Sequence, residues 1–211
     1  MKKDLEIRSI SVEFQADNEN RIISGLAIPL EQKSELLGGE FYEIISRNAI
    51  SEDFLKKQDI KIYLDHNPKN GTFARCKKGE GSLDLNITDR GLEFSFEAPN
   101  TVFGNALLEG IRRKDYDAVS FGFIVGKDEW VKNEDKTYLR TVNSIKLIDE
   151  IFILSQAPAY EQTNVNIRSL EAYKEEEEKI LQEEIRKNEI FNKLDSIVND
   201  IDTKYEKYLI K

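Results

Sequence analysis

An abrupt change of pattern near residue 167 divides the sequence and sets what the chain can fold into. Before it, short segments with alternating apolar and polar residues are separated by turn-forming residues, which predicts β-strands. After it, residues 171–211 contain no glycine or proline and are dense in Glu, Lys, Leu and Ile, which favours a helix. We therefore expect a β-rich α+β domain at residues 1–168 and an acidic helical tail at residues 169–211.

The expected domain is assembled from many short strands, one longer helix, and a short helix that begins near Asn48 with Ser46 as its cap or runs through residues 53–57 with Ser51 as its cap. Residues 5–12 and 21–28 are expected to pair as a hairpin across an Asp-Asn-Glu-Asn turn. Apolar residues at helical spacing, followed by a basic end, predict a helix over residues 101–113, and residues 127–136 are expected to form a charged loop. The other expected strands cover residues 41–45, 60–65, 71–75, 81–85, 92–97, 118–125, 137–142 and 145–154.

Composition excludes several classes of function. The net charge of −9 argues against nonspecific binding of nucleic acid, which needs a basic surface. No apolar run approaches the ~20 residues of a membrane span, and the first residues do not resemble a secretion signal, so a cytosolic protein is expected. With Cys76 as its only cysteine and His66 as its only histidine, the chain should hold no internal disulfide, no metal and no cofactor.

The tail carries an apolar seam in its C-terminal half. Its members recur in alternating steps of four and three, as in a coiled coil. Two heptads are few for a stable coiled coil, so a solvated acidic helix and a helix that binds a partner both remain open. The seam residues are Leu194, Val198, Ile201, Tyr205 and Tyr208.

His66 is the residue around which acid–base chemistry must be organised. Histidine alone has an unperturbed pKa near neutral pH, and this chain has one. It continues the parity of Ile62 and Leu64, so we expect its side chain to point inward at the end of a strand, which Asn67-Pro68 terminates. The alternative is a structural histidine whose hydrogen bonds are satisfied.

Ser120 is the serine best placed to be a nucleophile that uses His66 as its base. It lies within the nearly continuous apolar run 118–125, which predicts a buried strand. Gly122 should leave space for a substrate backbone, with Phe121 and Phe123 as apolar walls. Two other serines lack this setting and rank lower: Ser95 and Ser24.

A buried acid would orient the histidine. Glu150 lies in the apolar strand 145–154, where an unpaired charge costs several kcal/mol. Pairing with an imidazole would remove that cost. Asp149 and Asp65 are alternatives, although in a strand Asp65 should face away from its neighbour His66.

Three segments, in this order, resemble the prohead maturation proteases of tailed bacteriophages. They read Tyr-Leu-Asp-His-Asn at residues 63–67, Val-Ser-Phe-Gly-Phe at 119–123, and Leu-Ile-Asp-Glu-Ile-Phe-Ile-Leu-Ser-Gln-Ala-Pro-Ala-Tyr at 147–160. Each motif is short, but their order and spacing together are specific. The resemblance covers residues 5–168.

The resemblance implies a serine protease with a fold like that of herpesvirus assemblin, a β-barrel flanked by helices. It assigns Ser120 as nucleophile, His66 as general base and Glu150 as the acid. The herpesvirus enzymes use a second histidine, which this chain lacks, so an acid serves or the site is a dyad. Backbone N–H groups or an arginine would stabilise the oxyanion; Arg140 is the first candidate, against the alternative of a surface salt bridge.

The same resemblance implies a place and partners for the activity. Such an enzyme acts in the host cytoplasm, inside the immature capsid, where it cleaves scaffold or the scaffolding segment of the major capsid protein, and then itself. It is expected to form a dimer and to bind neither nucleic acid nor membrane. The alternative is an inactive capsid-associated or scaffold-associated protein of the same fold. A small-molecule esterase is disfavoured because the chain has no Gly-x-Ser-x-Gly motif.

Overall fold

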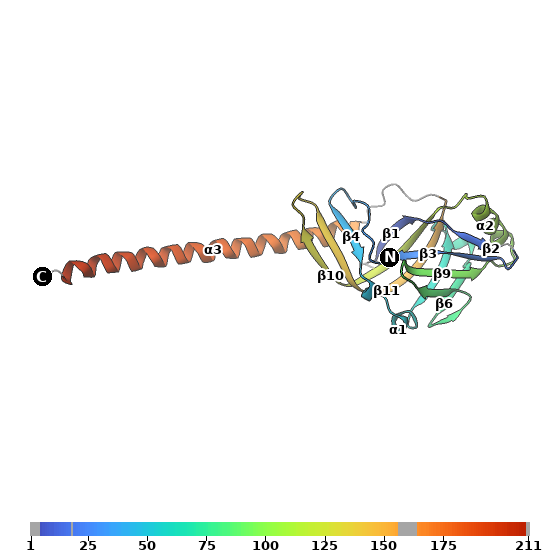
Figure 1. Ribbon diagram of the computed structural model, residues 1–211, viewed down its shortest axis with the longest axis horizontal. Coiled ribbons are helices and arrows are strands. Elements are labelled where there is room, and N and C mark those ends of the chain that lie inside the picture. Colours follow the sequence, from blue (N-terminus) through green and yellow to red (C-terminus); the bar gives the residue numbers. More distant parts are fainter. Residues whose placement is uncertain (1–4, 18, 156–163, 210–211) are drawn as a thin grey trace. The chain divides into compact units, whose positions relative to one another are not determined.

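The computed structural model of the chain describes residues 5–17, 19–155 and 164–209, with the side chains of residues 70, 164–169 and 200–209 excepted. It contains two compact units, Met1–Asn166 and Ile167–Lys211. Unit 1 consists of two β-sheets with short helices, and unit 2 belongs to the single long helix α3, Asn164–Leu209 (Figure 1). None of the described helices is long and apolar enough to cross a membrane.

The larger sheet is built around the long antiparallel pair β10 and β11. β1 pairs with the other edge of β10, while β4 and β5 both run parallel to β11, β4 along its first part and β5 along its last. This arrangement makes β10, β11 and β5 consecutive neighbours. The strands of this sheet are β1 (Glu6–Ser11), β10 (Ala118–Lys132), β11 (Tyr138–Leu154), β5 (Asp59–Leu64), β6 (Ala74–Lys77), β7 (Glu80–Gly81) and β4 (Phe41–Ile45).

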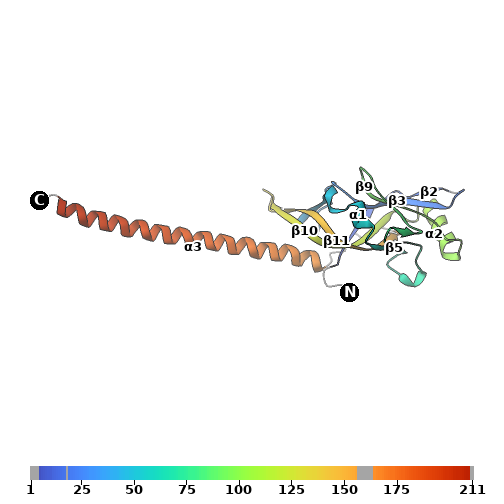
Figure 2. The same ribbon diagram turned by 90° about the horizontal axis from the view of Figure 1, so that it is seen from below.

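The smaller sheet packs against one face of the larger one (Figures 1 and 2). Fully buried side chains of both sheets form one apolar core, with Ile23 and Phe96 from the smaller sheet and Ile62, Phe121 and Ile151 from the larger. Alternate residues of β10 and β11 therefore point either into this core or to the opposite face. The strands of the smaller sheet, in spatial order, are β2 (Gln15–Asp17), β3 (Ile22–Pro29), β9 (Gly91–Glu97) and β8 (Asp84–Ile87).

Helix α2 (Val102–Arg112) confirms the helix expected from the apolar spacing. The hydroxyl of Thr101 caps it by accepting a 3.1 Å hydrogen bond from the backbone N–H of Gly104, and such a cap stabilises by about 1 kcal/mol. Leu107 and Ile111 anchor its buried face in the core. The remaining short helices are α1 (Glu52–Leu55) and two 3₁₀ turns, η1 (Arg47–Ala49) and η2 (Pro68–Asn70).

The expected β-barrel is not found: within the described residues, both sheets stay open. The β-rich α+β class is compatible with the structure, but no strand pairing closes either sheet on itself. One end strand of each sheet is very short, with two residues in β7 and three in β2. The two open sheets share one apolar core and so form a sandwich.

Two strand predictions are corrected by long-range pairing. The first strand does not pair with residues 21–28; β1 pairs with β10, and the short β2 makes the hairpin with β3. The charged segment expected as a loop is mostly strand, because β10 continues to Lys132 and pairs with the start of β11. Charged residues are tolerated there because many of them lie on the solvent-exposed side of the β10–β11 hairpin.

Candidate active site

Ser120 faces away from the apolar core. Its neighbours Val119 and Phe121 point into that core, so alternation turns the Ser120 hydroxyl to the opposite face of the larger sheet. The side chain is completely buried, and its Oγ has no hydrogen-bond partner among the described residues. Leaving a buried hydroxyl unpaired costs about 1–3 kcal/mol. Ser120 thus has unused hydrogen-bonding capacity, as a nucleophile without its substrate would.

The aromatic walls expected around Ser120 lie on the wrong face. Phe121 and Phe123 are 1% and 0% exposed, and both belong to the core between the sheets. The reason is strand alternation, which puts the side chains of Phe121 and Phe123 on the face opposite to that of Ser120. Gly122 remains beside the site, paired with Ile7 of β1, and a Cβ added there would make ordinary contact with the side chain of Leu5.

His66 does not continue the parity of its strand, so the expected inward orientation is wrong. β5 ends at Leu64, and Asp65 and His66 adopt left-handed backbone angles, with φ of 48° and 52°. The N–H of Asn67 donates a 2.9 Å hydrogen bond to the carbonyl of Leu64, which closes a tight turn. Asp and His tolerate this conformation better than most residues. The turn leaves His66 exposed at the sheet edge.

Phe152 of β11 links Ser120 and His66. It lies opposite Ser120 in the β10–β11 register, on the face away from the core, and the His66 ring packs against it with 4.1 Å between ring centroids. The ring of Tyr63 of β5 stacks against Phe152 with 5.9 Å between centroids. The fold therefore brings the only histidine and the candidate nucleophile to one face, next to the same aromatic ring. No hydrogen bond joins the two in the described structure.

The candidate acids Glu150 and Asp65 lie on opposite sides of Phe152 along the strand direction. Glu150 is partly buried on the same face, opposite Lys61 of β5, and about 7 Å before Phe152 along the strand. His66 lies beyond the other end, after the residue paired with Ile153. Asp65 adjoins His66, and its Oδ1 accepts a 3.3 Å hydrogen bond from the N–H of Ser155.

The charge of Asp65 acts on other groups in this region. Burial raises the pKa of Tyr116, and the negative charges of Asp65 and Asp115 raise it further. Asp65 and His66 form a turn and not the expected strand, so strand alternation does not turn Asp65 away from His66. Asp65 is therefore a geometrically reasonable alternative to Glu150, and Asp149 of β11 is a third, partly buried acid.

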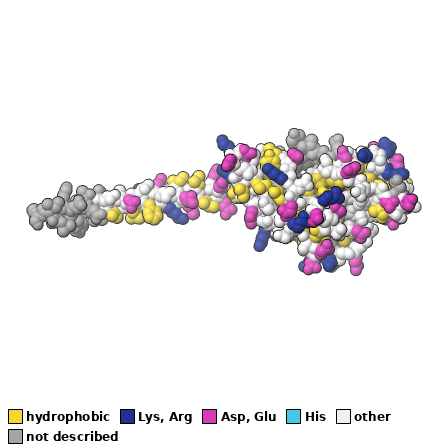
Figure 3. All heavy atoms as spheres, in the orientation of Figure 1, with side chains coloured by type: hydrophobic (Ala, Val, Ile, Leu, Met, Phe, Trp, Pro, Cys, Tyr) yellow, Lys and Arg dark blue, Asp and Glu magenta, His cyan; other side chains and the backbone are white. Residues whose placement is uncertain are grey.

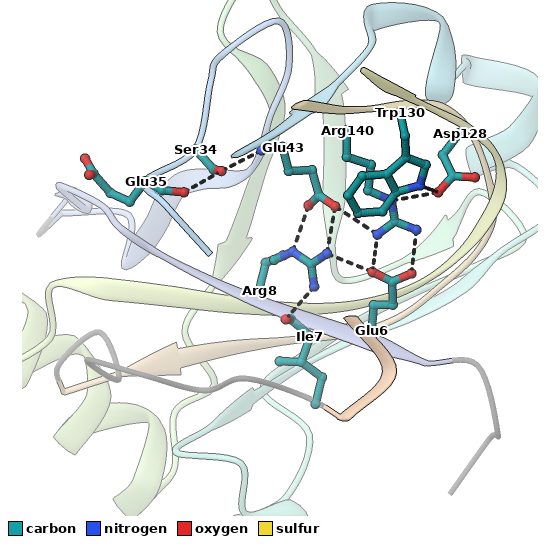
Figure 4. A network of polar contacts seen from close by, with 9 residues as sticks. All are labelled: Glu6, Ile7, Arg8, Ser34, Glu35, Glu43, Asp128, Trp130 and Arg140. Atoms are coloured by element: carbon teal, nitrogen blue, oxygen red, sulfur yellow. Dashed lines mark hydrogen bonds and ion pairs between the residues drawn. The ribbon is translucent and has the colours of Figure 1, made fainter. Parts of the chain in front are cut away.

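Arg140 is not at the surface and not near Ser120. It is 1% exposed and lies in a buried ion cluster, which we define as Glu6, Arg8, Glu43, Asp128 and Arg140 (Figure 4). Arg140 donates to Glu6 at 2.6 and 2.9 Å, to Glu43 at 3.1 Å and to Asp128 at 2.7 Å. Arg8 donates to Glu43 and Glu6 at 2.7 Å.

This cluster occupies the far part of the β10–β11 pair. Arg140 is paired with Trp130, on the order of 30 Å along the strand from Ser120. Its guanidinium is already bonded to three carboxylates, so Arg140 does not lie where it could stabilise an oxyanion at Ser120. Burial raises the pKa of Glu6, but hydrogen bonds and charges of Arg140 and Arg8 outweigh it, and the pKa of Glu6 is lowered.

A groove of about 720 Å³ opens beside the candidate site. It runs between the segment that links β1 to β2, the end of α2 and the start of β10. Ser11, which lines it, is paired with Ala118, two residues before Ser120. Its other lining residues include Ile111 of the core and Val12, which packs against that core, so the groove lies at the end of the sheet next to the start of β10. Its lining includes Phe14, Arg112, Lys114 and Tyr116.

Sequence reasoning missed Ser9, which lies directly opposite Ser120 in the β1–β10 register. The available signal was the alternation within residues 5–12, which separates Ser9 from Glu6 and Arg8. That alternation does not reveal which set is buried. The structure buries Glu6 and Arg8 in the ion cluster and turns Ser9 to the side of Ser120.

Comparison with known proteins identifies one family. The family model described as caudovirus prohead serine protease matches residues 3–176, which include Ser120, His66 and all three candidate acids. No curated protein matches the chain, and no solved structure does.

Proposed function

The chain belongs to the caudovirus prohead serine protease family, and on this premise we propose that it is the endopeptidase that cleaves the scaffold, or the scaffolding segment of the major capsid protein, and then itself. Membership of a prohead protease family supports a role in phage capsid maturation, with capsid proteins as the proposed substrates. One observation carries the proposal: the only histidine and a buried, unpaired serine meet at the same Phe152 ring.

The proposed reaction is acyl transfer. His66 accepts the Ser120 proton while Ser120 Oγ attacks the scissile carbonyl, and backbone N–H groups stabilise the oxyanion. The protonated His66 then gives its proton to the leaving amine, and an acyl-enzyme remains. Water, deprotonated by His66, hydrolyses this ester and restores the Ser120 hydroxyl. On the strength of the family resemblance we assign Glu150 as the acid that orients His66; Asp65, which adjoins His66 in the same turn, is the alternative that the described geometry favours.

The buried position of Ser120 requires the site to open before a peptide can enter. Phe152 lies between Ser120 and His66, and it is 7% exposed. We assign the opening to this side chain, because its displacement would join base and nucleophile and uncover Ser120 together. The neighbouring groove then holds part of the peptide, with its mixed apolar and charged lining.

Helix α3 supplies the proposed contact with the capsid assembly or with a second copy of the chain. It has 46 residues, which corresponds to about 70 Å. Apolar side chains along it stay more than half exposed, including Ile180, Phe191, Leu194 and Val198 (Figure 3). An amphipathic helix with such a face binds another helix. We propose scaffold or coat protein, or a homodimer, as its partner.

The function is tested by expressing the chain together with the capsid protein of the same phage and measuring intact masses. The unmodified chain should shorten the capsid protein and itself at defined sites, and Ser120→Ala should leave both intact. Ser95→Ala, in a strand of the smaller sheet, is the matched control and should cleave normally.

Cleavage by Ser120→Ala at the unmodified rate would refute the nucleophile. Absence of cleavage by the unmodified chain, with capsid protein bound, would favour the alternative of an inactive capsid-associated protein.

A further inference from the structure

Two serine hydroxyls stand out in the described part of the chain. Ser9 Oγ and Ser120 Oγ are the buried side-chain polar atoms there that have no hydrogen-bond partner. They come from different strands, yet the β1–β10 register places Ser9 directly opposite Ser120. Buried polar groups are normally paired, so two unpaired hydroxyls at one cross-strand position call for a common explanation.

The geometry lets the two hydroxyls interact. Residues directly opposite on antiparallel strands project to the same face, with Cβ atoms about 4.5–5.5 Å apart. A change of χ1 at either serine can therefore bring one hydroxyl within hydrogen-bonding range of the other. Ser9 reaches Ser120 from β1, whereas Phe152 adjoins it from β11 and His66 lies beyond that ring.

β1 is fixed on both sides of Ser9. Glu6 and Arg8, which point to the other face, are held in the buried ion cluster by hydrogen bonds to Arg140 and Glu43. After the strand, the N–H of Val12 donates a 2.7 Å hydrogen bond to the carbonyl of Asp117, just before β10. The Ser9 backbone is thus held in place, while its buried hydroxyl has no hydrogen-bond partner among the described residues.

We infer that Ser9 is a positioning residue for the nucleophile, with its hydroxyl donating a hydrogen bond to Ser120 Oγ. This rests on the proposed function. When His66 removes the Ser120 proton, negative charge develops on Ser120 Oγ, and a change of χ1 lets the Ser9 O–H, directly across the strand pair, donate to that oxygen. A hydrogen bond to a charged partner is stronger than one between neutral groups. Ser9 forms no covalent bond and gives up no proton.

A fluorescent fluorophosphonate tests this inference, because it reacts with an activated serine without requiring the natural substrate. The full-length chain should be labelled, and Ser120→Ala should not be. Ser9→Ala should be labelled about tenfold more slowly, as expected for the loss of one such hydrogen bond. Ser24→Ala, in the cross-strand pair Ser24 and Ser95 of the smaller sheet, is the matched control and should be labelled at the unmodified rate.

Two further readouts separate positioning from a structural role. Ser9→Ala removes an unpaired buried hydroxyl, so its melting temperature should stay unchanged or rise while labelling slows. Ser9→Thr keeps the hydroxyl and should be labelled at most of the unmodified rate. Valine has nearly the same shape as threonine but no hydroxyl, so Ser9→Val should be labelled as slowly as Ser9→Ala. The comparison of Ser9→Thr with Ser9→Val shows whether the hydroxyl itself is needed, even where the alanine variant folds poorly.

Each outcome bears on a different statement. Labelling of Ser9→Ala and Ser9→Val at the unmodified rate overturns the role of Ser9 and leaves the protease proposal intact. Failure of the unmodified chain to be labelled, or equal labelling of Ser120→Ala, overturns the proposed nucleophile and the Ser9 inference with it.

Discussion

At the scale of single residues, the open choice is the acid that orients His66. Glu150 shares a face with Phe152 but lies before it on β11, whereas Asp65 is in the same left-handed turn as His66. We predict that Glu150→Gln lowers the fluorophosphonate labelling rate by 10- to 100-fold, roughly the effect of losing a charged partner of a general base. Asp65→Asn should change it less, and the comparison is made on the purified full-length chain across pH 5 to 9. A larger loss in Asp65→Asn would transfer the role to Asp65.

At the scale of elements, the buried ion cluster ties β1, β4, β10 and β11 together (Figure 4). Removing one partner leaves a buried charge uncompensated, so Glu6→Gln should lower the free energy of unfolding by about 3–5 kcal/mol. The folded pKa of Glu6 lies below its ordinary value of 4.5, so its contribution is present above pH 4.5 and is lost as pH falls through the folded pKa.

Denaturant unfolding between pH 7 and pH 3 checks this prediction. The unmodified chain should lose stability on acidification, and Glu6→Gln should show a flatter dependence. Asp84→Asn, at an exposed position of β8, is the control and should keep the slope of the unmodified chain. A Glu6→Gln variant with unchanged stability at pH 7 would show that the cluster contributes little.

At the scale of the whole molecule, the two compact units suggest two separable tasks. We predict that deleting residues 177–211, which lie beyond the matched family region, leaves fluorophosphonate labelling within about twofold, since all candidate site residues remain. The same deletion should abolish incorporation into proheads, measured by mass spectrometry of purified particles. Replacing Phe191, Leu194 and Val198 by serine in the full-length chain should reproduce the loss. Normal incorporation of both variants would remove the assembly role from α3.

The sequence alone determined the local features of this protein. Alternation identified most of the strands, helical spacing and a basic end identified α2, and a composition without glycine or proline identified α3. These features depend on neighbouring residues, so they are readable from short windows. The presence of a single histidine likewise limits the candidate imidazole base to His66.

Only the tertiary structure decided which residues meet and which face of each strand is buried. Alternation divides the side chains of β1 between two faces of the sheet. The face with the charged side chains is the buried one, because Glu6 is hydrogen-bonded to Arg140, which lies 134 residues away in the chain. The same long-range register puts Ser9 beside Ser120 and moves Phe121 and Phe123 to the core. A left-handed turn, rather than strand parity, sets His66 against Phe152. Pairing register and burial depend on residues far apart in the chain, and no short stretch of sequence contains both partners.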